Sequence, residues 1–495
     1  MFQHKVIKNA VLSIIQVVIS AIILFILYRY LLDELGAAQL GIWSLVFATV
    51  SASRISELGL SGSVLKFVAQ YLAQNEANLA IAVIQTAMIS IIVFMSLVLL
   101  IAYPITKWIL GYVISPKELT MALPLLPYAL FSLWLTSLMG VIQSALEGCQ
   151  RFDLRAYVQM GTQGLYLILA IGLVPSYGLY GLAYAQILQG FLLLITNWFF
   201  LRYLLRELPL IPWHWSWSIF REIFSYSFYF QVISISQIIY DPITKILISR
   251  FGGLELTGYY EIANRFVQQL RAILLSANRV LIPRFTELST KEPIAIKKLY
   301  KNTYQVLFYV SIPFYGGILA IIVPFSEIWL GYYEIHFVLF TLFLTIGWLI
   351  NTLSAPAYIA YLGLGDLRWN TIGHIVIALL NGLLGLGLGI FNGGLGVVIG
   401  WVISLIVGSS IYVYMIHREY DIPLTTLLPK ESYLLVWVTG VGTVISWIFY
   451  DAFHSLKFSS ITFIGSILIY TLVVIFPILQ HPLRIKVINR LLPTT

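Results

Sequence analysis

Long apolar runs, separated by short polar stretches, follow one another along the whole chain. Most of these runs reach the roughly 20 residues that a helix needs to cross the hydrocarbon core of a bilayer. The runs are continuous and do not alternate between apolar and polar positions, which excludes a membrane β-barrel. The pattern predicts fourteen membrane-spanning helices, at residues 8–32, 40–65, 79–103, 121–146, 156–174, 180–202, 222–249, 256–282, 303–325, 337–361, 371–391, 395–416, 432–450 and 459–479.

The composition agrees with this pattern. The 495 residues are 60% hydrophobic and only 10% charged, and their mean hydropathy is +0.90. A soluble chain carries about 25% charged residues, so this chain cannot cover a water-facing surface of its size. A soluble enzyme, a nucleic-acid-binding domain and a disordered scaffold are therefore excluded. The single cysteine, Cys149, allows no internal disulfide and argues against a structural metal site.

The basic residues predict how the chain is oriented in the membrane. If the N-terminus is cytoplasmic, nineteen of the 29 Lys and Arg residues fall on the inner side and five lie within spans. The five on the outer side are Arg29, Lys107, Lys117, Arg250 and Lys457. Positive residues collect on the cytoplasmic side of membrane proteins, so we expect both termini there. The first apolar run lacks a small-residue cleavage site and is interpreted as a retained span.

The connections between spans are short, and none is long enough for a soluble domain. The connection 203–221 carries alternating tryptophans, Trp213, Trp215 and Trp217, with arginines nearby. This composition is typical of a segment at the level of the lipid headgroups. The sequence contains no Gly-Lys pair and hence no phosphate-binding ATPase loop.

An internal repeat relates the two halves of the chain. A shift of 217 residues places Gly41, Trp43 and Arg54 on Gly258, Tyr260 and Arg271, and it also places Gly148-x-x-Arg151 on Gly365-x-x-Arg368. A shift of 220 places Pro104 and Leu110-Gly111-Tyr112 on Pro324 and Leu330-Gly331-Tyr332. The repeat covers six spans, so the two copies run in the same direction and are expected to enclose a cavity.

These observations predict an all-α polytopic membrane protein with two pseudo-symmetric six-helix lobes and two C-terminal helices. The predicted parts are an N-lobe at 1–206, an interfacial linker at 207–221, a C-lobe at 222–418, and the last two spans with a cytoplasmic tail at 419–495.

Charged and amide side chains within the spans are the main candidates for a functional site. A charge at the centre of a span costs about 2.5–3.5 kcal/mol on insertion scales, so these side chains should face a cavity or one another. Arginine suits phosphate oxygens, and amides suit sugar hydroxyls. The predicted substrate-binding residues are Arg54, Glu57, Lys245, Glu261, Asn264, Arg265, Gln268, Arg271 and Asn278.

Structural roles compete with this interpretation. Glu261–Arg265 and Asp241–Lys245 have the spacing of ion pairs within one helix, and Arg279 lies where a side chain can extend to the headgroups. Asp241 precedes Pro242, and a broken helix beside a carboxylate could bind Na⁺ or a proton. Asp241 is therefore the candidate for ion coupling. No catalytic residue, metal ligand or other cofactor site is predicted.

Several segments resemble a known family over nearly the whole chain. They are Leu40-Gly41-Ile42-Trp43-Ser44, Glu57-Leu58-Gly59-Leu60, Val64-Leu65-Lys66-Phe67 and Ala145-Leu146-Glu147-Gly148-Cys149-Gln150-Arg151-Phe152. With six, six and two spans, the chain resembles the polysaccharide (O-antigen, Wzx-type) flippases of the multidrug/oligosaccharidyl-lipid/polysaccharide exporter superfamily.

The resemblance implies a flippase in the bacterial plasma membrane, not an enzyme. Its substrate would be an undecaprenyl-pyrophosphate-linked oligosaccharide, moved by alternating access from the inner to the outer leaflet. Implied partners are this polyprenyl-linked glycan, membrane lipids and the glycan polymerase machinery, without nucleic acid. In related lipid flippases, arginines of spans two and eight line the headgroup cavity, and the matching positions here are Arg54 and Arg271.

Three alternatives remain open. A lipid II (peptidoglycan precursor) flippase of this superfamily carries cavity arginines in its first span, which here is apolar apart from Gln16 and small hydroxyls until Arg29. A cation-coupled drug antiporter should have an acidic cavity, whereas the span charges here are basic on balance. A membrane glycan polymerase, ligase or glycosyltransferase needs positioned carboxylates, and the short outer connections contain no carboxylate pair.

Overall fold

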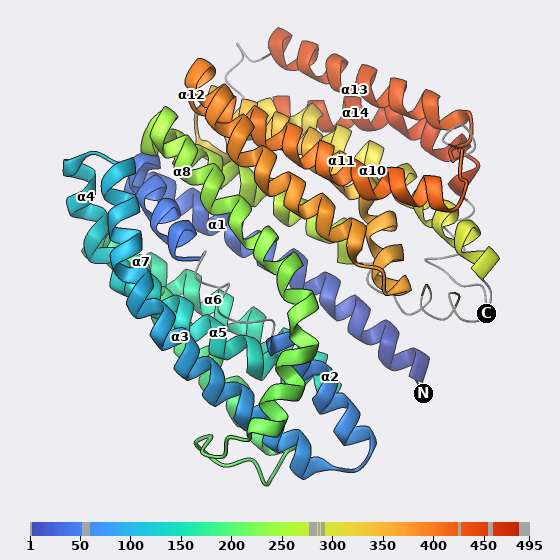
Figure 1. Ribbon diagram of the computed structural model, residues 1–495. Helices are drawn as coiled ribbons and strands as arrows, with labels where there is room; N and C mark the ends of the chain where they lie inside the picture. The colour runs from blue at the N-terminus through green and yellow to red at the C-terminus, as the bar shows by residue number, and fades with distance from the viewer. Residues whose placement is uncertain are drawn as a thin grey trace. The chain divides into compact units, whose positions relative to one another are not determined.

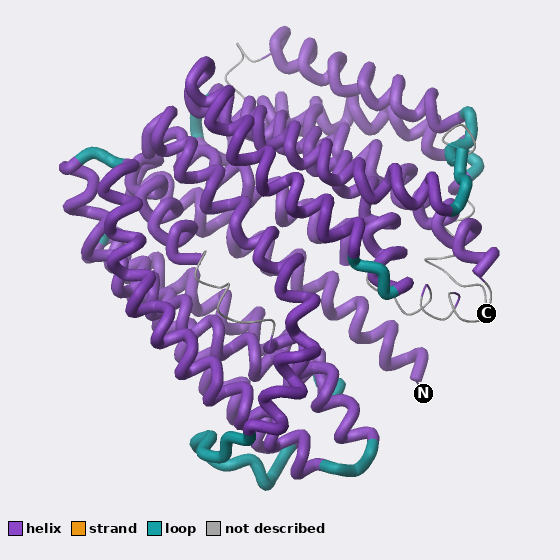
Figure 2. Tube along the Cα trace, viewed as in Figure 1, coloured by secondary structure: helices purple, strands orange, loops and turns teal. Residues whose placement is uncertain are grey.

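A computed structural model describes residues 2–51, 60–276, 285, 288, 293–423, 427–453 and 459–484. Long helices joined by short loops make up these residues, which contain no strand (Figures 1 and 2). The helices are α1 (Phe2–Ser51), α2 (Leu60–Ala73), α3 (Ala77–Val113), α4 (Pro116–Ala122), the 3₁₀ helix η2 (Leu123–Leu125), α5 (Leu126–Gly148), α6 (Phe152–Tyr177), α7 (Leu179–Leu204), α8 (Trp217–Ser276), α10 (Pro293–Leu330), α11 (Ile335–Leu364), α12 (Arg368–Glu419), α13 (Glu431–Phe453) and α14 (Ser459–Gln480).

The helices account for the predicted spans. Ten helical stretches of the described chain are long and apolar enough to cross a membrane. Breaks with positive φ divide α1 at Gly36, α8 at Gly253 and α12 at Gly393. The 52 residues of α12 alone would measure about 78 Å, more than twice the hydrocarbon thickness, so α12 supplies two spans. The predicted all-α membrane fold is confirmed.

Two helices run further than the apolar pattern predicts. The predicted third span ends at residue 103, but α3 continues through Pro104 to Val113, and α10 likewise continues through Pro324 to Leu330. Proline is tolerated inside membrane helices because neighbouring groups satisfy the carbonyl that it leaves free. Pro104 and Pro324, which the repeat relates, both lie inside the last third of their helices.

The repeat found in the sequence reappears in the helix breaks. Gly36 and Gly253 are also 217 residues apart, and their φ angles are 76° and 81°. One turn further on, a Cβ atom on Gly41 would overlap the carbonyl of Leu254, and one on Gly258 would overlap the carbonyl of Ala37. The contact is reciprocal, since 37 and 254 are separated by the same 217 residues. The repeated glycines allow α1 and α8 to cross with their backbones touching.

The chain forms two compact units, Met1–Gly258 and Tyr259–Thr495. The lobe and linker boundaries predicted from the sequence stay a prediction. In the first unit, α5 packs against α2, α3 and α7, and α6 pairs with α7. The segment between α7 and α8 lies against α3, where Gln85 Oε1 accepts hydrogen bonds from the backbone N–H groups of Trp213 and His214, both at 3.2 Å. The indole of Trp215 donates to Ser90 Oγ at 3.0 Å.

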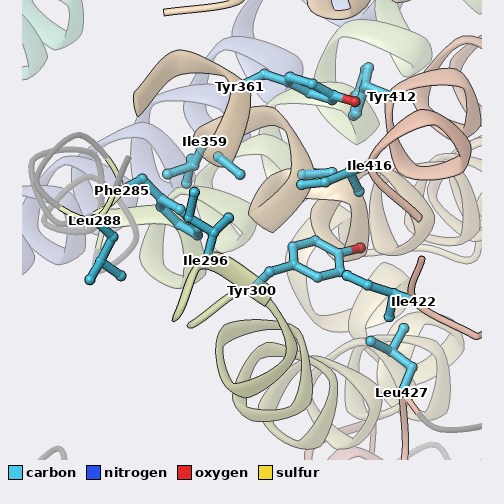
Figure 3. Packing of buried hydrophobic residues seen from close by; sticks show 12 residues of the cluster. Phe285, Leu288, Ile296, Tyr300, Ile359, Tyr361, Tyr412, Ile416, Ile422 and Leu427 are labelled. Atoms are coloured by element: carbon cyan, nitrogen blue, oxygen red, sulfur yellow. The ribbon is translucent and has the colours of Figure 1, made fainter. Parts of the chain in front are cut away.

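In the second unit, α10 packs against α11, α13 and α14. The last two helices are fixed to it by side-chain hydrogen bonds to its carbonyls: Tyr470 donates to Pro313 at 2.6 Å and Trp447 to Leu319 at 2.8 Å. A group of buried side chains gathers where the start of α10 lies near the ends of α11 and α12 (Figure 3). It includes Tyr300, whose hydroxyl lies 2.9 Å from His417 Nε2.

Candidate functional site

The candidate site is a polar face on the second half of α8. Asn264, Gln268 and Arg271 follow one another at intervals of four and three residues, which puts them on one side of the helix over about 10 Å. All three are half-buried, and Asn264 and Gln268 make no hydrogen bond with the described residues. A row of unpartnered polar groups is expensive in an apolar helix, so it marks a place for a polar ligand or water.

Arg271 is held by side chains of α11. One guanidinium nitrogen, Nη2, donates to Asn351 Oδ1 at 2.7 Å. The guanidinium carbon lies 4.2 Å from the centroid of the Trp348 ring, in the geometry of a cation–π contact. These two contacts fix the position and the plane of the guanidinium group.

A chain of hydrogen bonds holds Asn351 in turn. Its amide nitrogen donates to Ser409 Oγ on α12 at 2.7 Å, which leaves the amide oxygen directed at Arg271. Ser354 donates to the backbone carbonyl of Asn351 at 2.6 Å, and its hydroxyl lies 3.1 Å from that of Tyr412. The arginine therefore rests on a network that spans three helices of the second unit.

The guanidinium group keeps most of its donors free. An arginine has five N–H donors, and the described residues accept only one here. The Nε atom is buried without a hydrogen-bond partner, and no described carboxylate forms an ion pair with Arg271. A fixed cation with free donors in an apolar unit can bind an anion, and its planar fork suits two oxygens of a phosphate.

Four of the other predicted residues pair with each other. Arg265 Nε donates to Glu261 Oε1 at 2.8 Å, with the glutamate side chain buried and the arginine half exposed. In the first unit, Lys245 Nζ lies 2.6 Å from Asp241 Oδ2, and the lysine side chain is only 3% exposed. Both ion pairs match the spacing of four residues that suggested a structural role. Charge neutralisation within each pair leaves Arg271 as the described span cation most able to take a ligand.

The remaining predicted residues cannot be placed. Arg54, Glu57 and Asn278 lie outside the described residues, so the prediction that Arg54 and Arg271 line one cavity stays a prediction. The described residues contain no group of three His, Cys, Asp or Glu side chains that could hold a metal ion. Coupling to Na⁺ or a proton at Asp241 likewise stays a prediction.

Sequence reasoning missed the residues that support Arg271. Trp348, Asn351, Ser409 and Tyr412 lie on the second half of the chain, 77 to 141 residues from the arginine. An asparagine in an apolar span indicates a polar contact inside the membrane, because amides are costly there. Only the tertiary structure shows that Asn351 accepts its hydrogen bond from Arg271.

Solved structures share this fold over 83% to 100% of the chain. A lipid II flippase MurJ in an inward closed conformation matches with a TM-score of 0.66 at 14% identity, covering 100% of this chain and 99% of that one. An inward-facing multidrug resistance MATE family transporter of the MOP superfamily matches with a TM-score of 0.67 at 15% identity, covering 83% and 98%. A MOP superfamily transporter from Pyrococcus furiosus matches with a TM-score of 0.58 at 15% identity, covering 84% and 96%.

These likenesses show that the chain has the fold of MurJ and of MATE family transporters, and its long apolar helices make it a multi-pass membrane protein. A sequence model of a family described as polysaccharide biosynthesis protein matches residues 68–333, more than half of the chain. The chain belongs to this polysaccharide biosynthesis family, and the resemblance seen in the sequence is confirmed. No curated protein matches the chain.

Proposed function

We propose that the protein is a flippase that moves an undecaprenyl-pyrophosphate-linked oligosaccharide from the inner to the outer leaflet of a bacterial plasma membrane. The observation that carries the proposal is Arg271, a fixed guanidinium with free donors inside an apolar helical unit. Membership of a polysaccharide biosynthesis family and the flippase fold support the same substrate class. Movement of the two sequence repeats against each other would expose the binding site first to one side of the membrane and then to the other.

The chemistry of the substrate fits the polar face of α8. A pyrophosphate carries negative oxygens that can accept from the free guanidinium N–H groups of Arg271. The unpartnered amides of Asn264 and Gln268 can donate to and accept from the first sugar hydroxyls. The polyprenyl chain would stay in the lipid, because it is as apolar as the acyl chains around it. The protein would act by binding and orienting, without making or breaking a covalent bond.

The test is Arg271→Ala in proteoliposomes that contain an undecaprenyl-pyrophosphate-linked glycan. Transport should be lost, since one lost charge-assisted interaction in an apolar setting is worth several kcal/mol. Arg271→Lys keeps the charge without the fork and should retain only part of the activity. Arg250→Ala removes an exposed arginine from the part of α8 that precedes the break at Gly253, and serves as the matched control. Normal transport by Arg271→Ala with normal folding would refute the proposal.

The lipid extract of cells depleted of this protein tests the substrate. Mass spectrometry should show a multi-sugar repeat unit accumulating on the polyprenyl carrier. Accumulation of the peptidoglycan precursor would instead identify a lipid II flippase, and an unchanged lipid profile would favour a drug antiporter.

A further inference from the structure

A second polar site lies in the first unit, among α5, α6 and α7, which pack against one another (Figure 1). These helices line a partly open cavity of about 300 Å³. At about 30 Å³ for each molecule, the cavity has room for roughly ten waters, at the lower end of the range for small-molecule sites. The lining residues are Ser132, Leu135, Thr136, Met139, Gly140, Gln143, Gln159, Gln186, Gln189, Gly190 and Leu193.

The lining is polar but carries no charge. Four of its eleven residues are glutamines, contributed by all three helices, and two more are a serine and a threonine. Gln143 Nε2 donates to Gln159 Oε1 at 3.2 Å, so one pair of amides is oriented by mutual contact. Uncharged hydrogen-bonding groups of both kinds, donors and acceptors, therefore surround the cavity.

Several of these groups have no protein partner. Ser132 is 4% exposed, and its hydroxyl is buried without a hydrogen bond. The side chains of Gln186 and Gln189 also make no hydrogen bond with the described residues. Buried polar groups are nearly always hydrogen-bonded in folded proteins, so the buried Ser132 hydroxyl calls for a partner inside the cavity. The amides of Gln186 and Gln189 are half-buried and are open to the same occupant.

The chemistry of the lining selects the occupant. A metal ion or an organic cation would need carboxylates, and a phosphate would need cations, yet the lining has neither. A purely apolar ligand would leave the Ser132 hydroxyl and the amides of Gln186 and Gln189 without partners. A neutral molecule rich in hydroxyl groups satisfies both the donors and the acceptors, because each hydroxyl both donates and accepts.

We propose that this glutamine-lined cavity is a binding site for one or two neutral sugar residues. The source of the sugar, a glycan attached to the lipid carrier, rests on the proposed function, but the site itself does not depend on Arg271. Gln186 and Gln189 would contact the sugar hydroxyls from α7, Gln159 from α6, and Gln143 and Ser132 from α5. The site would thus recognise the glycan while Arg271 recognises the pyrophosphate.

Binding is tested with the full-length protein in lipid nanodiscs, because sugar-based detergents would compete for the site. The probes are N,N′-diacetylchitobiose and maltose, two neutral disaccharides, measured by saturation-transfer-difference NMR. The double variant Gln186→Met/Gln189→Met keeps the side-chain length and removes the amides, and should weaken binding of the preferred disaccharide about tenfold or more. Gln163→Met exchanges a glutamine of α6 outside the lining and should leave binding unchanged; because Gln163 accepts a hydrogen bond from Ser20, its thermal unfolding is measured alongside.

Ser132→Ala guards against variants that merely misfold. It removes a hydroxyl that has no protein partner, so the thermal unfolding temperature should stay the same or rise while sugar binding weakens. Neither disaccharide binding to the wild type, or equal binding to all variants, would overturn the proposed sugar site.

The transport assay separates this inference from the proposed function. If the wild type flips the glycan lipid and Gln186→Met/Gln189→Met raises the glycan-lipid concentration needed for half-maximal flipping, both proposals are supported. If disaccharides bind in the cavity but no glycan lipid is flipped, the sugar site stands and the flippase fails. If Arg271→Ala stops flipping while the glutamine variants neither bind nor flip differently from the wild type, the flippase stands and the sugar site fails.

Discussion

Arg271 shows how much a single side chain depends on the residues around it. Its guanidinium is oriented by one hydrogen bond to Asn351 and by the face of Trp348, and neither contact neutralises its charge. Removing Asn351 should therefore disturb both the site and the fold of the second unit.

We predict that Asn351→Leu lowers the stability of the second unit by about 1–3 kcal/mol, because it removes the acceptor of one Arg271 N–H and the amide that donates to the Ser409 hydroxyl. Thermal unfolding followed by size-exclusion chromatography of the membrane protein measures this. Asn264→Leu removes an amide that has no described partner and should change stability much less. Equal losses in the two variants would contradict the network.

Cys149, in the turn between α5 and α6, gives a pH-dependent prediction. Burial raises the pKa of its thiol to about 11, whereas an ordinary thiol has a pKa of about 8.5. The thiolate is the form that reacts with maleimide, so at pH 7 only a very small fraction of this thiol is in the reactive form. Labelling of this single cysteine should be slow at pH 7 and should accelerate about tenfold per pH unit up to pH 10. Fast labelling at pH 7 would show that the thiol is not buried in this way.

At the scale of elements, the crossing of α1 and α8 explains why glycine is needed at positions 41 and 258. The apolar pattern predicts both helices, but it gives no reason for Gly41 and Gly258 beyond their place in the repeat. The structure supplies that reason, since each glycine lies against a backbone carbonyl of the other helix.

We predict that Gly41→Ala destabilises the first unit by about 1–3 kcal/mol, because the added methyl group must push the two backbones apart. The matched control is Gly161→Ala on α6, where nothing lies within 4 Å of the added atom. Because alanine is the better helix former, the control should leave stability unchanged or raise it by up to about 1 kcal/mol. Thermal unfolding of both variants tests the crossing, and a harmless Gly41→Ala would disprove it.

Glycines also allow close packing at two places where the chain reverses direction between helices. Gly178, between α6 and α7, and Gly393, at the break in α12, have φ angles of 55° and 60°. Three residues later, Gly181 and Gly396 each press on the carbonyl of the residue eight positions earlier. Side chains at these positions would prevent the helices from returning so closely, so the glycine-rich stretch around residue 393 serves helix packing, as its composition suggests.

At the scale of the whole molecule, charge distribution predicts topology. Most basic residues fall on the same predicted side of the membrane as both termini, which predicts that this side is cytoplasmic. A green fluorescent protein fused after Thr495 should therefore fluoresce, because it folds to its fluorescent form in the cytoplasm. An alkaline phosphatase fused after Lys117, in the predicted outer connection before α5, should be active, which requires export. A dark fluorescent protein after Thr495 together with an inactive phosphatase after Lys117 would show that the topology is the reverse of the predicted one.

The sequence by itself determined the membrane class, the all-α fold, the internal repeat and the helix that carries Arg271. Apolar run length, charge placement and repetition are local or periodic properties, and a bilayer admits few structures that satisfy them. It also indicated the ion pairs Glu261–Arg265 and Asp241–Lys245, because both lie within single helices where spacing alone sets the contact.

Only the tertiary structure decided which polar groups meet across helices. Asn351 and Ser409 lie on helices far along the chain from Arg271, and the four glutamines of the cavity come from three consecutive helices whose facing sides the sequence alone does not reveal. Helical periodicity tells which face a residue occupies but not which neighbour that face will contact. In an apolar environment, where hydrophobic burial favours no particular helix pairing, close packing of small residues and the pairing of scarce polar groups make that choice.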